Sequence, residues 1–369
     1  MNDIPQLSHA RQQVDTVLRA DEDASENAGF VVFGSSGDHD VLFWSCAYMM
    51  GSAPHTQWLV PGARIHGTIF MAIPHTEEPT MSDNAFVRSG LHLPQYRDGR
   101  RFDIEERDDT ITWHVDDRQY IWDPPHWRLR GAHAGVDVDL VAEAVGPGTW
   151  SAGPFETAAE NKAFGYDVPI TAAGTIAVGG RTFTLDGAHG SHERAGMGQG
   201  RDIVAEVDGA EVLVTDLFSD GVHIIFGQHT GRSLNFGRID IDGASISLMP
   251  LMGQGMMSVT TLERWHDPKS GLLLPSHWSI VMSNEGVTCE LDVRAIGRAY
   301  WHYTTKSGVM VMVWQLSRAN GVLYLPDGSR REITDALAAG RWGRSLLVAD
   351  ETTSGPRFAA LEELTAGAS

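Results

Sequence analysis

The sequence predicts an all-β protein built from two antiparallel β units with little helix. Apolar residues recur with a period of about two along most of the chain, and Gly, Asp and Asn turns separate short strands roughly every 8–12 residues. This pattern is typical of β-sandwiches and β-barrels. The strands outnumber the roughly eight of a small barrel, and 369 residues exceed one ordinary core, so we expect two units.

Residues 1–28 predict a polar arm with a weak helical stripe, followed by one β domain over 29–205 and a second over 206–369. The boundary is expected between 200 and 212. Residues 146–169 read as a long loop and 332–339 as a helix. Strands are expected at 41–50, 65–73, 101–105, 110–115, 127–130, 136–142, 175–178, 182–185, 211–217, 222–227, 233–241, 245–251, 257–265, 272–282, 287–295, 309–315 and 322–325.

Composition excludes several classes of partner. A formal net charge of -20 and a pI of about 5.1 argue against nucleic acid and anionic membrane surfaces. The N-terminus has no secretory signal, and no window approaches the ~18 apolar residues of a membrane span, so a cytoplasmic protein is expected. Cys46 and Cys289 lie in apolar runs and are expected to be buried free thiols. The oligomeric state stays open.

The densest chemistry lies in residues 185–196, which hold two histidines, two carboxylates, an arginine and several glycines. Histidine transfers protons near neutral pH, and a neighbouring carboxylate can orient it. The candidate catalytic residues are Asp186, His189, His192, Glu193 and Arg194. In an extended chain, His189 and His192 face opposite ways, so we expect one proton carrier and one structural partner. The alternative is a polar turn that faces water.

Two of the predicted strands, 41–50 and 65–73, are apolar on both faces. In a barrel, one face of such a strand packs against another domain while the other lines a cavity. The candidate substrate-binding residues are Trp44, Tyr48, Met49, His66, Phe70 and Met71, together with Trp122 from the aromatic segment 120–127. The alternative is an ordinary apolar core.

Motifs for cofactors are lacking. The order His189-x-x-His192-Glu193 differs from the helical H-E-x-x-H of zinc proteases. Gly196, Gly198 and Gly200 lack dinucleotide-binding spacing, and there is no P-loop and no G-x-S-x-G nucleophile motif. We therefore expect no organic cofactor, no metal and no covalent catalysis.

The segment 186–196 and the all-β pattern resemble the double-lipocalin group, which includes carotenoid 1,2-hydratase, AttH-like proteins and cofactor-free Diels–Alderases. Their first β domain closes with a segment like G-x-x-x-x-H-x-x-x-G. Many relatives have an aromatic residue, often Trp, just before the last glycine, where this chain has Ala195. The resemblance in architecture covers residues 30 to 350, while the matching motif covers about a dozen residues. It implies two lipocalin-like domains and cofactor-free hydration, dehydration, isomerisation or cyclisation of terpenoid, carotenoid or polyketide-like molecules.

We therefore expect a hydratase or dehydratase that acts on a hydrophobic substrate such as a terpenoid or allylic alcohol. His189 or His192 would carry the proton, and Asp186 or Glu193 would orient the histidine or act as the acid. Arg194 would hold a carboxylate. The alternatives are a cofactor-free isomerase or pericyclic cyclase, and a non-catalytic carrier of an apolar molecule.

Overall fold

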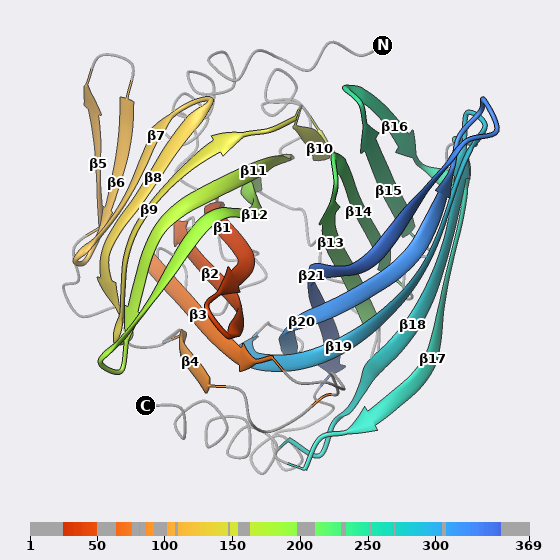
Figure 1. Cartoon of the computed structure of the whole chain (residues 1–369). Coiled ribbons are helices and arrows are strands. Elements are labelled where there is room, and N and C mark those ends of the chain that lie inside the picture. The colour runs from red at the N-terminus through yellow and green to blue at the C-terminus, as the bar shows by residue number, and fades with distance from the viewer. Residues whose placement is uncertain are drawn as a thin grey trace.

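In the computed structural model, the chain forms two curled antiparallel β-sheets (Figure 1). The structure describes residues 25–49, 64–75, 81, 86–91, 102–107, 110–146, 148–153, 163–197, 211–229, 234–250, 253–268, 270–304 and 308–347. Within these ranges there is no α-helix, so the all-β prediction is confirmed. It follows that none of the described segments is a helix capable of crossing a membrane.

The first sheet has twelve strands, which run in the order β4-β3-β2-β1-β12-β11-β9-β8-β7-β6-β5, with β10 paired to β11. Their bounds are β1 (Ser25–Ser36), β2 (His39–Met49), β3 (Arg64–Pro74), β4 (Phe86–Leu91), β5 (Phe102–Arg107), β6 (Thr110–Val115), β7 (Arg118–Asp123), β8 (His126–His133), β9 (Val136–Ala144), β10 (Thr149–Gly153), β11 (Ala163–Val178) and β12 (Arg181–Met197).

The second sheet has nine strands in the order β16-β15-β14-β13-β21-β20-β19-β18-β17. Their bounds are β13 (Glu211–Ser219), β14 (Val222–His229), β15 (Leu234–Ile241), β16 (Ala244–Leu248), β17 (Met256–His266), β18 (Leu273–Asn284), β19 (Val287–Thr304), β20 (Gly308–Tyr324) and β21 (Arg330–Leu347). The chain therefore leaves the first sheet at Met197 and enters the second at Glu211.

Each sheet curls around its own apolar core. The interior of the first is filled by aromatic and branched side chains that include Phe43, Phe70, Trp113 and Trp122. The second encloses a similar set around Trp278 and Trp342. Inward residues alternate with outward ones along each strand, as in Thr110–Val115, where every second side chain is buried.

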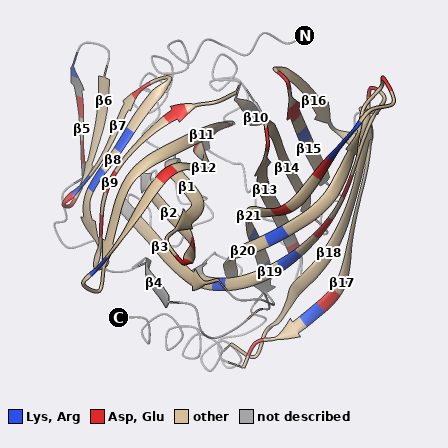
Figure 2. Cartoon of the chain, in the orientation of Figure 1, with Lys and Arg blue, Asp and Glu red and all other residues tan. Residues whose placement is uncertain are grey.

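A third apolar cluster joins the outer faces of the two sheets. It takes residues from β1–β3, including Trp44 and Met71, and from β13 and β19–β21, including Trp314. The rings of Trp44 and Trp314 are 5.7 Å apart. Charged residues interrupt β2 and β3 only rarely (Figure 2). These strands are apolar on both faces because one face fills the first core while the other packs against the second sheet.

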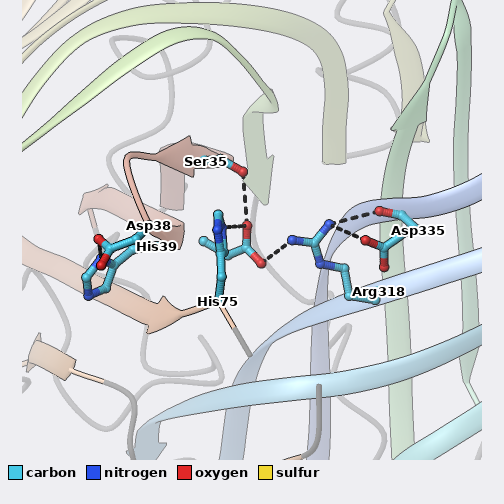
Figure 3. A network of polar contacts seen from close by, with 7 residues as sticks. Ser35, Asp38, His39, His75, Arg318 and Asp335 are labelled. Carbon is cyan, nitrogen blue, oxygen red and sulfur yellow. Dashed lines mark hydrogen bonds and ion pairs between the residues drawn. The ribbon is translucent and has the colours of Figure 1, made fainter. Parts of the chain in front are cut away.

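A polar network closes one margin of this contact. Asp40 of β2 is buried and accepts hydrogen bonds from Ser35 (3.0 Å) and from the Nε2 of His75 (3.0 Å). Its other carboxylate oxygen accepts a hydrogen bond from Arg318 of β20, which also contacts Asp335 at 3.2 Å (Figure 3). The ion pair between Asp40 and Arg318 fixes how β2 lies against β20.

Three expectations about local structure need correction. Residues 332–339 lie inside β21 and not in a helix, since β21 pairs with both β20 and β13. The predicted loop 146–169 contains β10 and the start of β11. Residues 25–28 of the predicted arm belong to β1, and its helical stripe, Leu7 to Leu18, lies outside the described residues. The thiols of Cys46 and Cys289 are free and buried, as expected.

We expect Trp44→Ala to lower the free energy of unfolding by about 3–5 kcal/mol, because it empties the centre of the contact between the sheets. Urea denaturation measures this loss. The control is Leu262→Ala, at a side chain that is 49% exposed, which should change stability by less than about 0.5 kcal/mol. Equal effects of the two substitutions would show that the sheets do not depend on this contact.

Candidate functional site

The histidine segment forms the second half of β12, and its side chains alternate between two environments. His192 and Arg194 point into the core of the first sheet, where they contact Phe30, Trp122 and Trp127. His189 and Glu193 point to the opposite face, where they contact Phe218 and Arg341 of the second sheet. The two histidines thus face opposite ways, as their spacing predicts. A Cβ at Gly190 would overlap the carbonyl oxygen of Val31, so this glycine allows β1 to lie close.

His192 has the properties of a structural residue. It is fully buried, its ring lies 4.5 Å from that of Phe30 and 5.1 Å from that of Trp127, and its Nδ1 lies 3.0 Å from the carbonyl oxygen of Gly29. Burial lowers the pKa of His192 to about 3. The imidazole is therefore neutral at ordinary pH and is shielded from solvent.

Arg194 is also buried, with its guanidinium 4.6 Å from the ring centre of Trp122 and 5.8 Å from that of Trp113. This is a cation–π contact inside the first sheet. Trp122, expected to bind substrate, is packed in this contact.

A buried polar network lies elsewhere in the first sheet, and His66 is its one member that the sequence predicted as a site residue. The ring of His66 stacks on that of His133 at 3.6 Å, and its Nε2 lies 2.9 Å from the hydroxyl oxygen of Tyr120. Arg118 donates to the hydroxyl oxygens of Ser45 (2.9 Å) and Thr68 (3.1 Å) and to the carbonyl oxygen of Val136 (2.7 Å). Burial lowers the pKa of Arg118. Because β2, β3, β7 and β8 each supply part of this network, no local motif marks it.

A second group of titratable side chains gathers between the sheets. We call it the intersheet cluster: Asp167 of β11, His189 and Glu193 of β12, Asp216 and Phe218 of β13, His223 of β14 and Arg341 of β21. Asp167 and Glu193 are direct partners in the pairing of β11 with β12. Like charges at such positions repel each other. Arg341 lies 3.3 Å from a carboxylate oxygen of Glu193 and compensates one of the two charges.

The aromatic part of the intersheet cluster is a stack of three rings. Phe218 lies between His189, at 4.6 Å, and His223, at 4.2 Å. The Nε2 of His223 is 2.7 Å from Asp216, and its Nδ1 is 3.0 Å from Asp240. Among the described residues, no hydrogen-bond partner reaches the Nδ1 of His189 or the Oδ2 of Asp216. Both buried atoms therefore have unused hydrogen-bonding capacity.

The pKa values within the intersheet cluster are driven apart. Burial, followed by the charge of Glu193, raises the pKa of Asp167 to about 8. Burial alone would lower the pKa of His223, but Asp216 and Asp240 outweigh it and raise that pKa to about 9. Burial lowers the pKa of His189. At neutral pH the cluster therefore holds a neutral carboxylic acid and a neutral imidazole, which is the pattern of acid–base sites.

The other predicted site residues are scattered. Asp186 is exposed on β12 and does not orient either histidine. Trp44 and Met71 do not line the interior of the first sheet, because their strands turn them toward the second sheet. Phe70 packs in the first core, 4.9 Å from the ring of Phe183. The side chains of Tyr48 and Met49 lie outside the described residues. Across the described ranges, no group of three or more His, Cys, Asp or Glu side chains could hold a metal ion.

The structural assignment of His192 predicts a specific pH effect. Its pKa of about 3 in the folded state lies below the ordinary value of 6.5. Between these two pH values the histidine is protonated in the unfolded chain and neutral in the folded chain, so acidification favours unfolding. Its stabilising contribution is present above pH 6.5 and is lost as the pH falls. His192→Phe, which keeps a ring next to Phe30, should therefore lose less stability than the wild type between pH 7 and pH 5. Identical losses in chemical denaturation would contradict the assignment.

Asp167 predicts the opposite dependence. Between its ordinary pKa of 3.8 and its raised pKa of about 8, the folded state holds a proton that the unfolded state has released, so raising the pH destabilises the fold. The melting temperature of Asp167→Asn should therefore rise relative to that of the wild type from pH 5 to pH 9. The matched control is Asp220→Asn in the exposed turn between β13 and β14, which should follow the wild type. A constant difference for Asp167→Asn would refute the raised pKa.

No known family model and no curated protein matches this sequence. Solved structures match it over most of its length. An AttH-like protein from Nitrosomonas europaea is 10% identical with a TM-score of 0.52, over 88% of this chain and 93% of its own. CghA is 10% identical with a TM-score of 0.57, over 89% and 90% of the two chains. CghA solved with Sch210972 gives 12% identity and a TM-score of 0.56, over 88% and 89%. The chain thus has the double-lipocalin fold that its resemblance implies.

Proposed function

We propose that the protein is a cofactor-independent hydratase or dehydratase that acts on a hydrophobic molecule at the intersheet cluster. The observation that carries this proposal is the pair formed by Asp167 and Glu193. The pKa of Asp167 is raised to about 8, so it is an acid at neutral pH, while its direct partner on β12 is a carboxylate held by Arg341. One acid and one base side by side are what addition or removal of water requires.

Dehydration would proceed by two proton transfers. Asp167 donates its proton to the substrate hydroxyl, the C–O bond breaks with both electrons on oxygen, and water leaves. Glu193 then takes a proton from the neighbouring carbon, and the electrons of that C–H bond form the C=C bond. The proton returns from Glu193 to Asp167 directly, because the two residues are paired across neighbouring strands. Hydration is the reverse sequence.

The surroundings suit a cationic intermediate. Once Asp167 has given up its proton, both members of the pair are negative, and the ring of Phe218 lies in the same cluster. Carboxylates and aromatic faces both stabilise positive charge, and a site shielded from water prolongs the life of a cation. An allylic or terpenoid alcohol is the substrate class that such an intermediate favours. CghA, which shares the fold, was solved with Sch210972, and this supports a small-molecule ligand.

A second candidate function is a cofactor-free isomerase or cyclase in which His189 is the base. The pKa of His189 is lowered by burial, and its Nδ1 has no hydrogen-bond partner among the described residues. His189 lies four residues before Glu193 on β12, which corresponds to about 13 Å along a strand. Protonation at Asp167 and deprotonation at His189 would then occur at distant carbons, as in double-bond migration or ring closure.

The test is oxygen exchange in ¹⁸O-labelled water. Wild-type protein incubated with monoterpene, sesquiterpene and diterpene allylic alcohols, such as linalool, should introduce ¹⁸O into the alcohol or release the diene, as detected by mass spectrometry. Asp167→Asn and Glu193→Gln should each lower this rate by about 10²–10⁴-fold while the protein stays folded. The matched controls are Asp220→Asn and Glu332→Gln, at exposed residues of the second sheet, which should keep the wild-type rate.

The alternatives give different outcomes. A rearranged product that contains no ¹⁸O would indicate an isomerase or cyclase. In that case His189→Phe should abolish its formation, and Glu193→Gln should not. Binding of the alcohols without any turnover would identify a carrier. Full exchange activity in Asp167→Asn would overturn the assignment of the acid.

A further inference from the structure

The outer face of the first sheet carries a groove with a volume of about 530 Å³. Small-molecule sites usually span about 300–1,000 Å³. The groove crosses β7, β8, β9 and β11 and reaches β12 at Gly187. Its apolar side chains on the outer face are Ile121, Val141 and Ala173, while Trp127, Ala142 and Ala172 of the interior core lie beneath it. Val141 is 52% exposed and gives the groove an apolar side chain that a ligand can reach.

A row of titratable residues lies at one end of the groove. Asp123 of β7 is the direct strand partner of His126 of β8, which is in turn the partner of Glu143 of β9. All three line the groove and all three are exposed. Within the described part of the chain, neither Asp123 nor Glu143 takes part in an ion pair. The row therefore places two uncompensated carboxylates beside an apolar surface.

The remaining charge of the groove is already neutralised. Arg128 is the arginine of the lining, and it donates from Nε (3.0 Å) and from an Nη atom (2.9 Å) to the two carboxylate oxygens of Asp139. Such a bidentate pair leaves little positive potential for another anion. The net potential of the groove is thus negative, and the formal charge of -20 on the whole chain adds to it.

We propose that this groove binds a hydrophobic molecule that carries a positive charge, and that the molecule reaches the intersheet cluster from there. The apolar lining takes the hydrocarbon part, and the carboxylates of Asp123 and Glu143 take an ammonium group. The groove and the cluster are contiguous: Thr171 lines the groove and is the direct strand partner of His189. The identification of this ligand as the substrate rests on the proposed function; its binding to the groove does not.

The probes are three naphthalenes of one shape: 2-naphthylmethylammonium, 2-naphthylmethanol and 2-naphthoate. In calorimetric titration of the full chain at low salt, affinity should fall in that order, by about fivefold from each probe to the next. The steps are small because charges near a protein surface interact through a high effective dielectric. The preference should shrink as salt is added, since both carboxylates are exposed. Equal affinities, or tightest binding of the carboxylate, would overturn the proposal.

Three variants locate the binding. Asp123→Asn combined with Glu143→Gln should remove the advantage of the ammonium ligand and leave the affinity of the alcohol unchanged. Ala173→Trp should weaken all three ligands at least tenfold by filling the groove. Val141→Lys, at a side chain exposed enough to tolerate the change, should favour the carboxylate instead. Glu332→Gln, an exposed carboxylate on β21, is the matched control and should change nothing. If Val141→Lys leaves the ranking unchanged, the groove is not the binding site.

Failure of this inference is distinguishable from failure of the proposed function. Asp167→Asn should bind the ammonium probe as the wild type does, because Asp167 does not line the groove. Charge-selective binding without ¹⁸O exchange would support the groove as a binding site and contradict the hydratase activity. Oxygen exchange that is unchanged in Ala173→Trp, the variant that fills the groove, would support the hydratase and contradict the groove as the route of its substrate.

Discussion

The architecture depends on apolar contact between the outer faces of the two sheets, made by β1–β3 on one side and β19–β21 on the other. This contact requires strands with two buried faces. Side chains on one face of these strands, such as Phe43 and Phe70, fill the first core. Those on the other face, such as Trp44, pack against the second sheet. A one-residue slip in register would exchange the two sets, so the register of these strands is strongly constrained. The ion pair between Asp40 and Arg318 secures the same contact at its margin.

Because apolar packing occupies both interiors and the centre of the contact, polar chemistry is confined to defined places. Inside the first sheet, Arg118 is held by hydroxyl and carbonyl oxygens, and His192 is neutral. A carboxylic acid with a raised pKa appears instead in the intersheet cluster, where charges of both sheets act on Asp167. Asp167 is half-buried, in contrast to the fully buried His192.

The sequence predicted the features that follow from periodicity. Strand alternation predicted the fold class, and the spacing of His189 and His192 predicted that they face opposite ways. It could not predict Asp167, which falls in a segment rich in Gly, Pro and small residues that reads as a loop, but lies in β11. Neither could it predict Arg341 or His223, which reach the cluster only through contact between sheets. Residues 332–339 were misread because alanines at mixed spacings carry little strand signal; the pairing of β21 with β20 and β13 decides their structure.

The pairing of Asp167 with Glu193 is the feature of the intersheet cluster that stability alone explains least. Two carboxylates at directly opposed positions of neighbouring strands destabilise a sheet, and partial burial adds to that cost. A sheet selected only for stability would place a hydroxyl or an apolar residue at one of these positions. The charge that offsets the repulsion, Arg341, comes from the other sheet. The pKa of Asp167 therefore depends on charges from both sheets, and the acid–base pair that we propose relies on how the two sheets pack.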